Sequence, residues 1–438
     1  MSISKNPAFN LKVILQETGI AADTLRAWER RYGLPLPQRT AGGHRLYSQY
    51  DIETIKWLLT RQAEGLSISR AVDLWNEHNA SGVDPLAGFA PSNLTSLLAV
   101  PASFASDTNL DSFRSQWIAA CMKFSESAAE QILNQAFSIF PVEAVCMEVL
   151  QKGMAEIGGL WYENRASVQQ EHFSSSLAMR RLDALLSASP APTRPQTVLV
   201  GCPPEEWHTF TPLLLSLFLR RRGLNVIYLG ANVPAERFEE TISTVKADLV
   251  ILVAQTLTTA ATLQTTALAL SNQKAQVSFG GRIFKQHKNL VEYLPGHYLG
   301  DAVETAIEQV EQLLKSKAKL AEVKSASQKH ITALQAFTSR RLQIENTVKE
   351  SIPPLAVSPD HLTTGIHFLG DNIIAALQFG DMELVTSEVE WLKTLLQSHE
   401  RPSQELADFM MNYARAVDKH INGQGQPIKA WLNAQAGT

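Results

Sequence analysis

Two histidines, each close to a glutamate in the sequence, are the side chains of this protein best suited to hold or sense a ligand. Glu171 directly precedes His172, and Glu206 precedes His208 by two positions. Histidine binds metals and changes its charge near neutral pH more readily than any other side chain. Nine residues separate Trp161 from the first pair. We expect Trp161, Glu171 and His172 to form a lid, and His208 to lie beneath the group that this lid covers.

Each of these residues also has an ordinary structural explanation. A tryptophan in a helical bundle usually belongs to the core, and a single histidine near a helix start is usually structural. An adjacent glutamate and histidine at a helix start can simply complement the helix dipole. We favour the functional interpretation because the lid residues occur together, shortly before the segment that carries His208.

The bulk properties describe an ordinary chain of several domains. Its 438 residues predict three or four domains, with 45% hydrophobic and 19% charged residues. The formal net charge of -4 is no sign of nucleic-acid binding, so DNA contacts would need a local basic patch. Three widely spaced cysteines predict neither a disulfide framework nor a zinc site. No targeting or transmembrane stretch is found, which predicts a cytoplasmic protein with no membrane partner.

The first domain, residues 1–78, has the pattern of a winged helix-turn-helix. Two short helices are predicted over residues 10–32, with a break at Gly19 and an N-cap at Asp23. The second helix would enter the major groove, and the wing after it would reach phosphate and sugar. The residues expected to contact DNA are Thr24, Arg26, Arg30, Arg39, His44, Arg45 and Tyr47.

The wing depends on Gly42-Gly43, which can form a tight hairpin turn. The contiguous run TLRAWERRYGLPLPQRTAGGHRLYS, residues 24–48, resembles the DNA-binding head of the MerR family of transcription regulators. Such heads bind pseudo-palindromic DNA as dimers, so the resemblance implies a two-fold protein. No long heptad run follows Glu77, so we expect dimerisation to use other domains.

A linker and a helical bundle are predicted next. Residues 79–109 are rich in Ala, Ser, Asn, Gly and Pro, as in a linker, with one short helix near residues 94–100. Residues 110–190 then show apolar side chains at three- and four-residue spacing in four segments, which predicts a four-helix cap bundle. Gly158-Gly159 should end its third helix. Trp161–His172 would be the loop and helix start that follow.

The third domain, residues 195–316, alternates apolar strands with helices. This pattern predicts a flavodoxin-like parallel α/β domain with a sheet covered on both faces. Ligands in such sheets bind at the carboxyl ends of the strands, and His208 follows the first strand. The strands are expected at residues 197–201, 225–230, 248–253, 276–281 and 296–300.

The bundle and the α/β segment resemble the CarH/LitR-type cobalamin-dependent photoreceptors, in which a MerR-type head precedes them. In that family the tryptophan packs on the upper, adenosyl face of the cofactor and the Glu-His pair lies against the same group. The resemblance implies these roles for Trp161, Glu171 and His172, and a place in the pocket lining for Val168. His208 stands where the family's lower axial ligand to cobalt stands, and an acidic neighbour would tune its basicity.

The family's Asp-x-His-x-x-Gly signature is matched in part, with Glu206 in place of Asp and Thr211 in place of Gly. Gln255-Thr256-Leu257 stands for its Ser-x-Leu, and Gly280-Gly281 matches the double glycine that lets the nucleotide tail approach the backbone. Thr211 and Gln255 add bulk there. The implied cofactor is adenosylcobalamin, with the metal held by His208. The residues implied to bind the cofactor are Trp161, Val168, Glu171, His172, Glu206, His208, Gln255, Leu257, Gly280 and Gly281.

Residues 317–438 lie outside both resemblances and predict an α-helical C-terminal extension of unassigned role. Lys317–Ser351 reads as a charged helix, polar enough to be a solvent-facing strut, and Pro353-Pro354 ends it. Three amphipathic helices are expected after it, at residues 361–379, 382–398 and 402–421.

The fold class is therefore multidomain α and α/β. We expect a DNA-binding transcription regulator rather than an enzyme, and the resemblance implies a repressor that senses light or cofactor state through cobalamin. Expected partners are a double-stranded DNA operator, further copies in a dimer or tetramer, and RNA polymerase. Two alternatives stay open: a MerR-type regulator whose pocket binds no cobalamin or another small molecule, and a corrinoid carrier for methyl transfer. A carrier has no use for Arg26 or Arg45.

Overall fold

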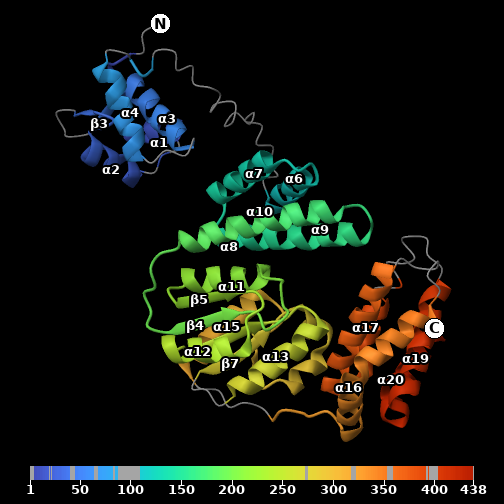
Figure 1. Cartoon of the computed structure of the whole chain (residues 1–438). Helices are drawn as coiled ribbons and strands as arrows, with labels where there is room; N and C mark the ends of the chain where they lie inside the picture. Colours follow the sequence, from blue (N-terminus) through green and yellow to red (C-terminus); the bar gives the residue numbers. More distant parts are fainter. Residues whose placement is uncertain are drawn as a thin grey trace. The chain divides into compact units, whose positions relative to one another are not determined.

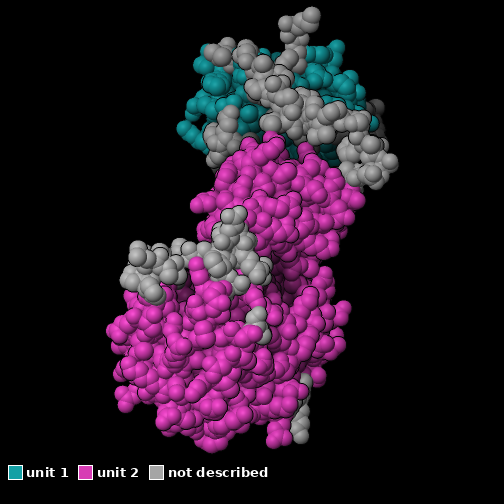
Figure 2. Space-filling view, turned by 90° about the vertical axis from the view of Figure 1, so that its right-hand side faces the viewer, with its two compact units in different colours: residues 1–107 teal, residues 108–438 magenta. Residues whose placement is uncertain are grey.

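The apolar periodicity of the chain becomes helices and strands in a computed structural model. The described residues are 4–18, 20, 22–39, 45–63, 68–81, 84–86, 109–271, 275–316, 322–352, 359–390, 393 and 403–437. They divide into two compact units, Met1–Asp107 and Thr108–Thr438 (Figure 2). No helix among these residues is long and apolar enough to cross a membrane. The predicted wing turn and the short helix near residues 94–100 fall outside the described ranges.

Unit 1 has the predicted helix-turn-helix with a small antiparallel sheet. The sheet order is β1-β3-β2, and β2 pairs with β3 as the two arms of the wing. Leu25 and Trp28 of α2 are buried, as their spacing predicted. The elements are β1 (Pro7–Phe9), α1 (Leu11–Thr18), α2 (Ala22–Tyr32), β2 (Gln38–Arg39), β3 (Arg45–Ser48), α3 (Gln49–Ala63) and α4 (Ile68–Ala80).

Unit 2 begins with the cap bundle, whose third helix is one continuous rod. The prediction that Gly158-Gly159 ends this helix is wrong, because it continues to Tyr162. Glycine weakens a helix without stopping it, and the Glu163 amide still donates to the Gly159 carbonyl at 3.1 Å. Trp161 therefore lies in the last helical turn. The elements are α6 (Leu110–Met122), α7 (Glu126–Ile139), α8 (Val142–Val145), the π-helical turn η1 (Cys146–Gln151), α9 (Lys152–Tyr162) and α10 (Val168–Ser187).

The α/β domain is a five-stranded parallel sheet in the order β5-β4-β6-β7-β8, which confirms the predicted flavodoxin-like class. Every residue of β4 and β6 is buried, as expected for central strands covered on both faces. The strands are β4 (Thr197–Gly201), β5 (Asn225–Gly230), β6 (Leu249–Val253), β7 (Gln276–Gly280) and β8 (His297–Tyr298). The helices are α11 (Phe210–Arg221), α12 (Ala235–Val245), α13 (Leu257–Leu270), α14 (Arg282–Gln286), the 3-10 turn η2 (Lys288–Tyr293) and α15 (Val303–Lys315).

The C-terminal extension is a packed helical bundle beside α13 (Figure 1). The predicted solvent-facing strut is wrong, because α16 begins only at Gln328 and buries Phe337, Ile344 and Val348. These apolar residues recur at helical spacing among the charges, so one stripe is enough to pack the helix. A last helix, α20, was not predicted. The elements are α16 (Gln328–Ser351), α17 (Pro359–Phe379), η3 (Met382–Val385), α19 (Ser403–Ile421), η4 (Asn422–Gly425) and α20 (Gln426–Ala436).

Candidate functional site

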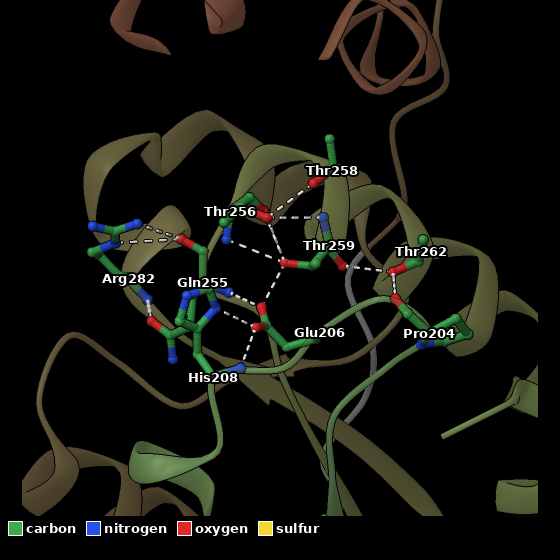
Figure 3. A network of polar contacts seen from close by, with 9 residues as sticks. All are labelled: Pro204, Glu206, His208, Gln255, Thr256, Thr258, Thr259, Thr262 and Arg282. Carbon is green, nitrogen blue, oxygen red and sulfur yellow. Dashed lines mark hydrogen bonds and ion pairs between the residues drawn. The ribbon is translucent and has the colours of Figure 1, made fainter. Parts of the chain in front are cut away.

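The loop between β4 and α11 holds Glu206 and His208 in a fixed arrangement (Figure 3). Glu206 is fully buried, and its Oε1 lies 2.7 Å from Nδ1 of His208 and accepts from the His208 amide at 2.9 Å. Its Oε2 accepts from the Gln255 amide and the Thr259 hydroxyl, both at 2.6 Å. The buried carboxylate is thus satisfied on both oxygens, and the histidine ring has one defined orientation.

The electrostatics of this pair follow from those contacts. Burial would raise the pKa of Glu206, but hydrogen bonds from His208, Thr259 and two backbone amides hold it below the ordinary value. The hydrogen bond to Glu206 raises the pKa of His208 against the opposing effect of burial. The His208 side chain is 67% exposed, and with Nδ1 engaged, Nε2 is the nitrogen left for a ligand.

At the ends of the neighbouring strands β6 and β7, two backbone segments lie close to each other. Gly281 has a φ of 128°, and a Cβ there would lie 1.8 Å from the Ala254 carbonyl oxygen, so only glycine fits. Gly280, in contrast, faces open space. Gln255 accepts from the Arg282 amide through its side-chain oxygen at 3.1 Å. Leu257 is fully buried in the core, in the first turn of α13.

The cap contributes the other predicted site residues from the end of α9 and the start of α10. Trp161 is partly exposed, and Val168 is 44% exposed. Nδ1 of His172 lies 2.7 Å from Oε2 of Glu171, with side-chain exposures of 74% and 29%. The lid side chains therefore remain accessible in this structure. Ser167 and Gln170 form a capping box that fixes where α10 begins.

The structure places the start of α10 within electrostatic reach of the His208 loop. The Glu171 carboxylate contributes to the raised pKa of His208. The cap packs on the α/β domain through α10 and α11, and an ion pair joins Arg221 to Glu143 at 2.7 Å. Figure 1 shows the cap helices lying across the α11 side of the domain. Glu171 on the cap and His208 on the α/β domain thus lie within electrostatic reach of each other.

A cavity of about 590 Å³ lies elsewhere in unit 2, between η2, β8 and α15. None of the predicted site residues lines it. It is bordered by Leu294, His297, Tyr298 and Gln312 among others. Parallel α/β sheets bind their ligands at the carboxyl ends of the strands, and the buried Glu206 gives that edge the stronger chemical case.

The predicted DNA-binding residues divide into several groups. Thr24, Arg26 and Arg30 are exposed on α2, as expected for a groove-facing surface. Tyr47 is a correction: it is fully buried and its hydroxyl donates to Glu29 at 2.6 Å, so it has no surface to offer DNA. Tyr47 lies on the buried face of the short strand β3. The hairpin prediction did not say which side chains of this strand point inward. His44 and the side chain of Arg39 fall outside the described residues.

Arg45 extends from β3 and pairs with Glu29 at 2.9 Å, with 30% of its side chain exposed. Glu29 was missed by sequence reasoning, although it ties the wing strand to α2 through both Arg45 and Tyr47. Its position between groove-facing arginines was the available signal. Thr259 was missed as well, since nothing in the sequence marked it as a partner of Glu206.

Three family models match the chain. The model described as MerR HTH family regulatory protein matches residues 9–77, and two described as B12 binding domain match residues 114–186 and 196–310. The corrinoid protein for monomethylamine from Methanosarcina barkeri is a structural neighbour at 17% identity. It covers 47% of this chain and 100% of its own, with a TM-score of 0.40, which is too low to support a conclusion.

Curated relatives match more than half of the chain. The HTH-type transcriptional repressor CarH of Myxococcus xanthus is 28% identical over 292 residues, which is 66% of this chain and 94% of the relative. The repressor CarA of the same organism is 30% identical over 245 residues, 55% of this chain and 75% of the relative. The chain therefore belongs to the family of MerR-type transcription regulators with B12-binding domains that includes CarA and CarH.

Proposed function

We propose that this regulator is a light-responsive repressor that binds adenosylcobalamin between its cap and its α/β domain, with Nε2 of His208 as the lower ligand of cobalt. The observation that carries the proposal is the His208 ring, held at Nδ1 by the buried Glu206 and exposed at its other edge. A metal-ligating histidine needs a partner of this kind to fix its orientation and basicity.

The single donor His208 fits a metal whose other ligands belong to the cofactor. Among the residues that the structure describes, no group of three or more His, Cys, Asp or Glu side chains could hold a metal ion. A single histidine suits cobalt in a corrin ring, whose nitrogens fill the equatorial positions. Gly280 and Gly281 add an open approach and a tight backbone turn at the same edge of the sheet.

The response is proposed to come from the lid. Adenosylcobalamin, when bound, supplies a light-labile cobalt–carbon bond to a bulky upper group. Trp161, Glu171 and His172 contact that group in the dark under this proposal and lose the contact in light. Differential contacts in two states shift the population of cap positions.

The head would bind operator DNA through the exposed face of α2, which carries Thr24, Arg26 and Arg30. Operators with two-fold symmetry require at least a dimer. A tetramer would place two pairs of DNA-binding heads on one operator. RNA polymerase is the further partner expected for a regulator bound at a promoter. Repression is the role of the relatives CarA and CarH.

An absorption experiment tests the cofactor. The protein is incubated with adenosylcobalamin in the dark, desalted, and measured before and after green light. We expect wild type to keep a red chromophore that bleaches, and His208→Ala to lose it or to change its spectrum. His297→Ala, which removes a histidine of the same domain away from the loop, should behave as wild type. A colourless desalted wild type would overturn the proposal.

A DNA experiment tests the output. Duplexes selected from a random library with the dark, cobalamin-loaded protein supply the operator. We expect binding to fall after illumination, and Arg26→Ala to weaken binding in the dark because α2 loses a basic contact. Equal binding in dark and light would exclude light control while leaving the DNA-binding assignment intact.

One observation favours an alternative, a MerR-type regulator whose pocket takes another small molecule or none. Gln255 is tied by its side chain and carbonyl to Arg282, and Thr211 occupies the first turn of α11. Both lie where the family resemblance places smaller residues along the nucleotide tail. A colourless desalted protein that still selects DNA would establish this alternative.

A further inference from the structure

The C-terminal bundle contacts the same helix that supports the His208 loop. None of the three matched family models reaches beyond residue 310, so the bundle is additional to the matched domains. α17 packs along α13, whose first turn lies beside Glu206. Figure 1 shows the C-terminal helices standing beside α13. The bundle is therefore placed to act on the ligand edge of the sheet through one helix.

One face of α13 holds the loop that carries His208. The Thr259 hydroxyl donates to Oε2 of Glu206 at 2.6 Å, and the Thr262 hydroxyl donates to the Pro204 carbonyl at 2.7 Å (Figure 3). These two threonines are three positions apart, so they lie on the same side of the helix. Any rotation or slide of α13 would move the hydrogen-bond partners of the loop.

The opposite face of α13 is held by Gln378 of α17. Its Nε2 donates to the Ala261 carbonyl at 2.9 Å and to Oε1 of Gln264 at 2.7 Å, with Thr265 at 3.3 Å. At about 100° per residue, Gln264 points roughly opposite to both Thr259 and Thr262, whereas Thr265 lies about 60° from Thr262. Helix α13 thus forms hydrogen bonds with the His208 loop on one side and with Gln378 on another.

The contact of Gln378 with Gln264 is specific, because Gln264 is buried and both the nitrogen and the oxygen of its side-chain amide are hydrogen-bonded. Gln264 is 7% exposed, and its Nε2 donates to the Tyr293 carbonyl at 2.7 Å. Its Oε1 takes its hydrogen bond from Gln378. Removal of the Gln378 amide would leave the buried Oε1 of Gln264 without its donor. Because an unpaired buried acceptor is costly, we expect α13 to shift in response.

We propose that Gln378 is a positioning residue for the ligand site: by fixing α13 it keeps Thr259 and Thr262 against the loop and so sets the direction of His208. The C-terminal bundle then acts as an internal brace on the ligand edge. Coupling of this kind is reciprocal, so a ligand held by His208 would also steady the bundle. The cobalamin measurement below rests on the proposed function, whereas the exchange measurement does not.

Hydrogen–deuterium exchange of the cobalamin-free, full-length protein tests the brace. Gln378→Met keeps the length of the side chain and removes the donor. We expect exchange at the amides of residues 255–262 to become about fivefold to tenfold faster, as for the loss of one buried hydrogen bond. Asn289→Ala is the matched control, because it removes a different contact with the bundle, to Asp381 at 3.3 Å, without touching α13.

Two outcomes overturn the proposal: unchanged exchange in Gln378→Met, or the same acceleration in Asn289→Ala. If Gln378→Met loses its helical content, Gln378→Asn replaces it, because the shorter side chain keeps the amide but no longer reaches Ala261, Gln264 and Thr265. Faster exchange confined to residues 255–262 is again expected, and unchanged exchange overturns the brace.

Adenosylcobalamin titration then tests the effect on His208. We expect Gln378→Met to bind about threefold to tenfold more weakly, with an altered visible spectrum, while Asn289→Ala matches wild type. Unchanged affinity and spectrum in a variant with faster exchange would show that the brace does not position His208. If wild type binds no cobalamin, the proposed function fails while the exchange result still decides whether the brace exists.

Discussion

Two of the Glu–His pairs that the structure describes in unit 2 have the same separation and opposite surroundings. In each pair the histidine Nδ1 lies 2.7 Å from a glutamate oxygen. Glu206 is fully buried and receives hydrogen bonds from four donors, whereas Glu171 keeps 29% of its side chain exposed. The same chemical pair is thus rigid on the α/β domain and loosely held on the cap.

This difference fits the two roles proposed for the pairs. A lower metal ligand must keep one orientation, so its partner carboxylate needs partners of its own. A lid must form its contacts only when the upper group is present, so its side chains need to be accessible in its absence. The cap fixes only where α10 starts, through Ser167 and Gln170, and leaves Glu171 and His172 accessible.

The largest expected contrast is in stability. Glu206→Ala removes the buried acceptor of the Thr259 hydroxyl, the Gln255 amide and the His208 amide, so it should lower the free energy of unfolding by about 2 to 4 kcal/mol. Glu171→Ala should change it by less than about 0.5 kcal/mol, as for most surface positions. Urea unfolding of the cobalamin-free protein, followed by circular dichroism, measures both. Similar losses in the two variants would remove the distinction between the pairs.

The pH dependence should sharpen the contrast. The pKa of Glu206 is lowered from 4.5, so its contribution is present above that value and is lost as pH falls through the folded-state pKa. The pKa of His208 is raised from 6.5, so its contribution is full below that value and is lost as pH rises through the folded-state pKa. The ion pair therefore stabilises the fold most between these limits.

Wild type should accordingly exceed His208→Ala in stability by more at about pH 5.5 than at about pH 8.5. Urea unfolding of both proteins at the two pH values provides the measurement. A difference that stays constant or grows with pH would contradict the raised pKa of His208.

How far the sequence could lead depends on how local each feature is. The order of strands and helices was predicted because each element carries its own apolar period. His208 was singled out because candidate ligand residues follow strand ends and because it stands where the resembled family has its lower ligand; its partner Glu206 stands two positions away. Thr259, which holds Glu206, lies 53 positions further along the chain, and no local pattern connects the two.

The corrections share this cause. Tyr47 was assigned to DNA because it stands in a basic wing, but its burial depends on Glu29 across the turn. The Gly158-Gly159 pair was predicted to end the helix because glycine is a weak helix former. Packing of α9 within the bundle outweighs this weakness, and the helix continues through both glycines. The contact of Gln378 with Ala261 joins residues 117 positions apart, so the role of the C-terminal bundle could come only from the fold.

A smaller effect separates the donors to Glu206 from their neighbours. Thr259→Val removes the hydrogen bond to the buried carboxylate and the capping-box hydrogen bond from the Thr256 amide, and should cost about 1 to 2 kcal/mol. Thr258→Val is the control, because Thr258 bonds only the Thr256 hydroxyl among the contacts drawn in Figure 3. Urea unfolding of the two valine variants gives the comparison. Equal stability in both would mean that Thr259 does not hold Glu206.

The smallest expected effect concerns the lid in the absence of a ligand. His172→Gln should leave the free energy of unfolding within about 0.5 kcal/mol of wild type, because the side chain is 74% exposed. Under the proposed function it should weaken adenosylcobalamin about threefold to tenfold and leave hydroxocobalamin, which lacks the bulky upper group, almost unchanged. Paired titrations in the dark measure this selectivity. An equal loss for both cobalamins would place His172 among the general supports of the site, and the cap pair would then resemble Glu206 and His208 in duty as well as in chemistry.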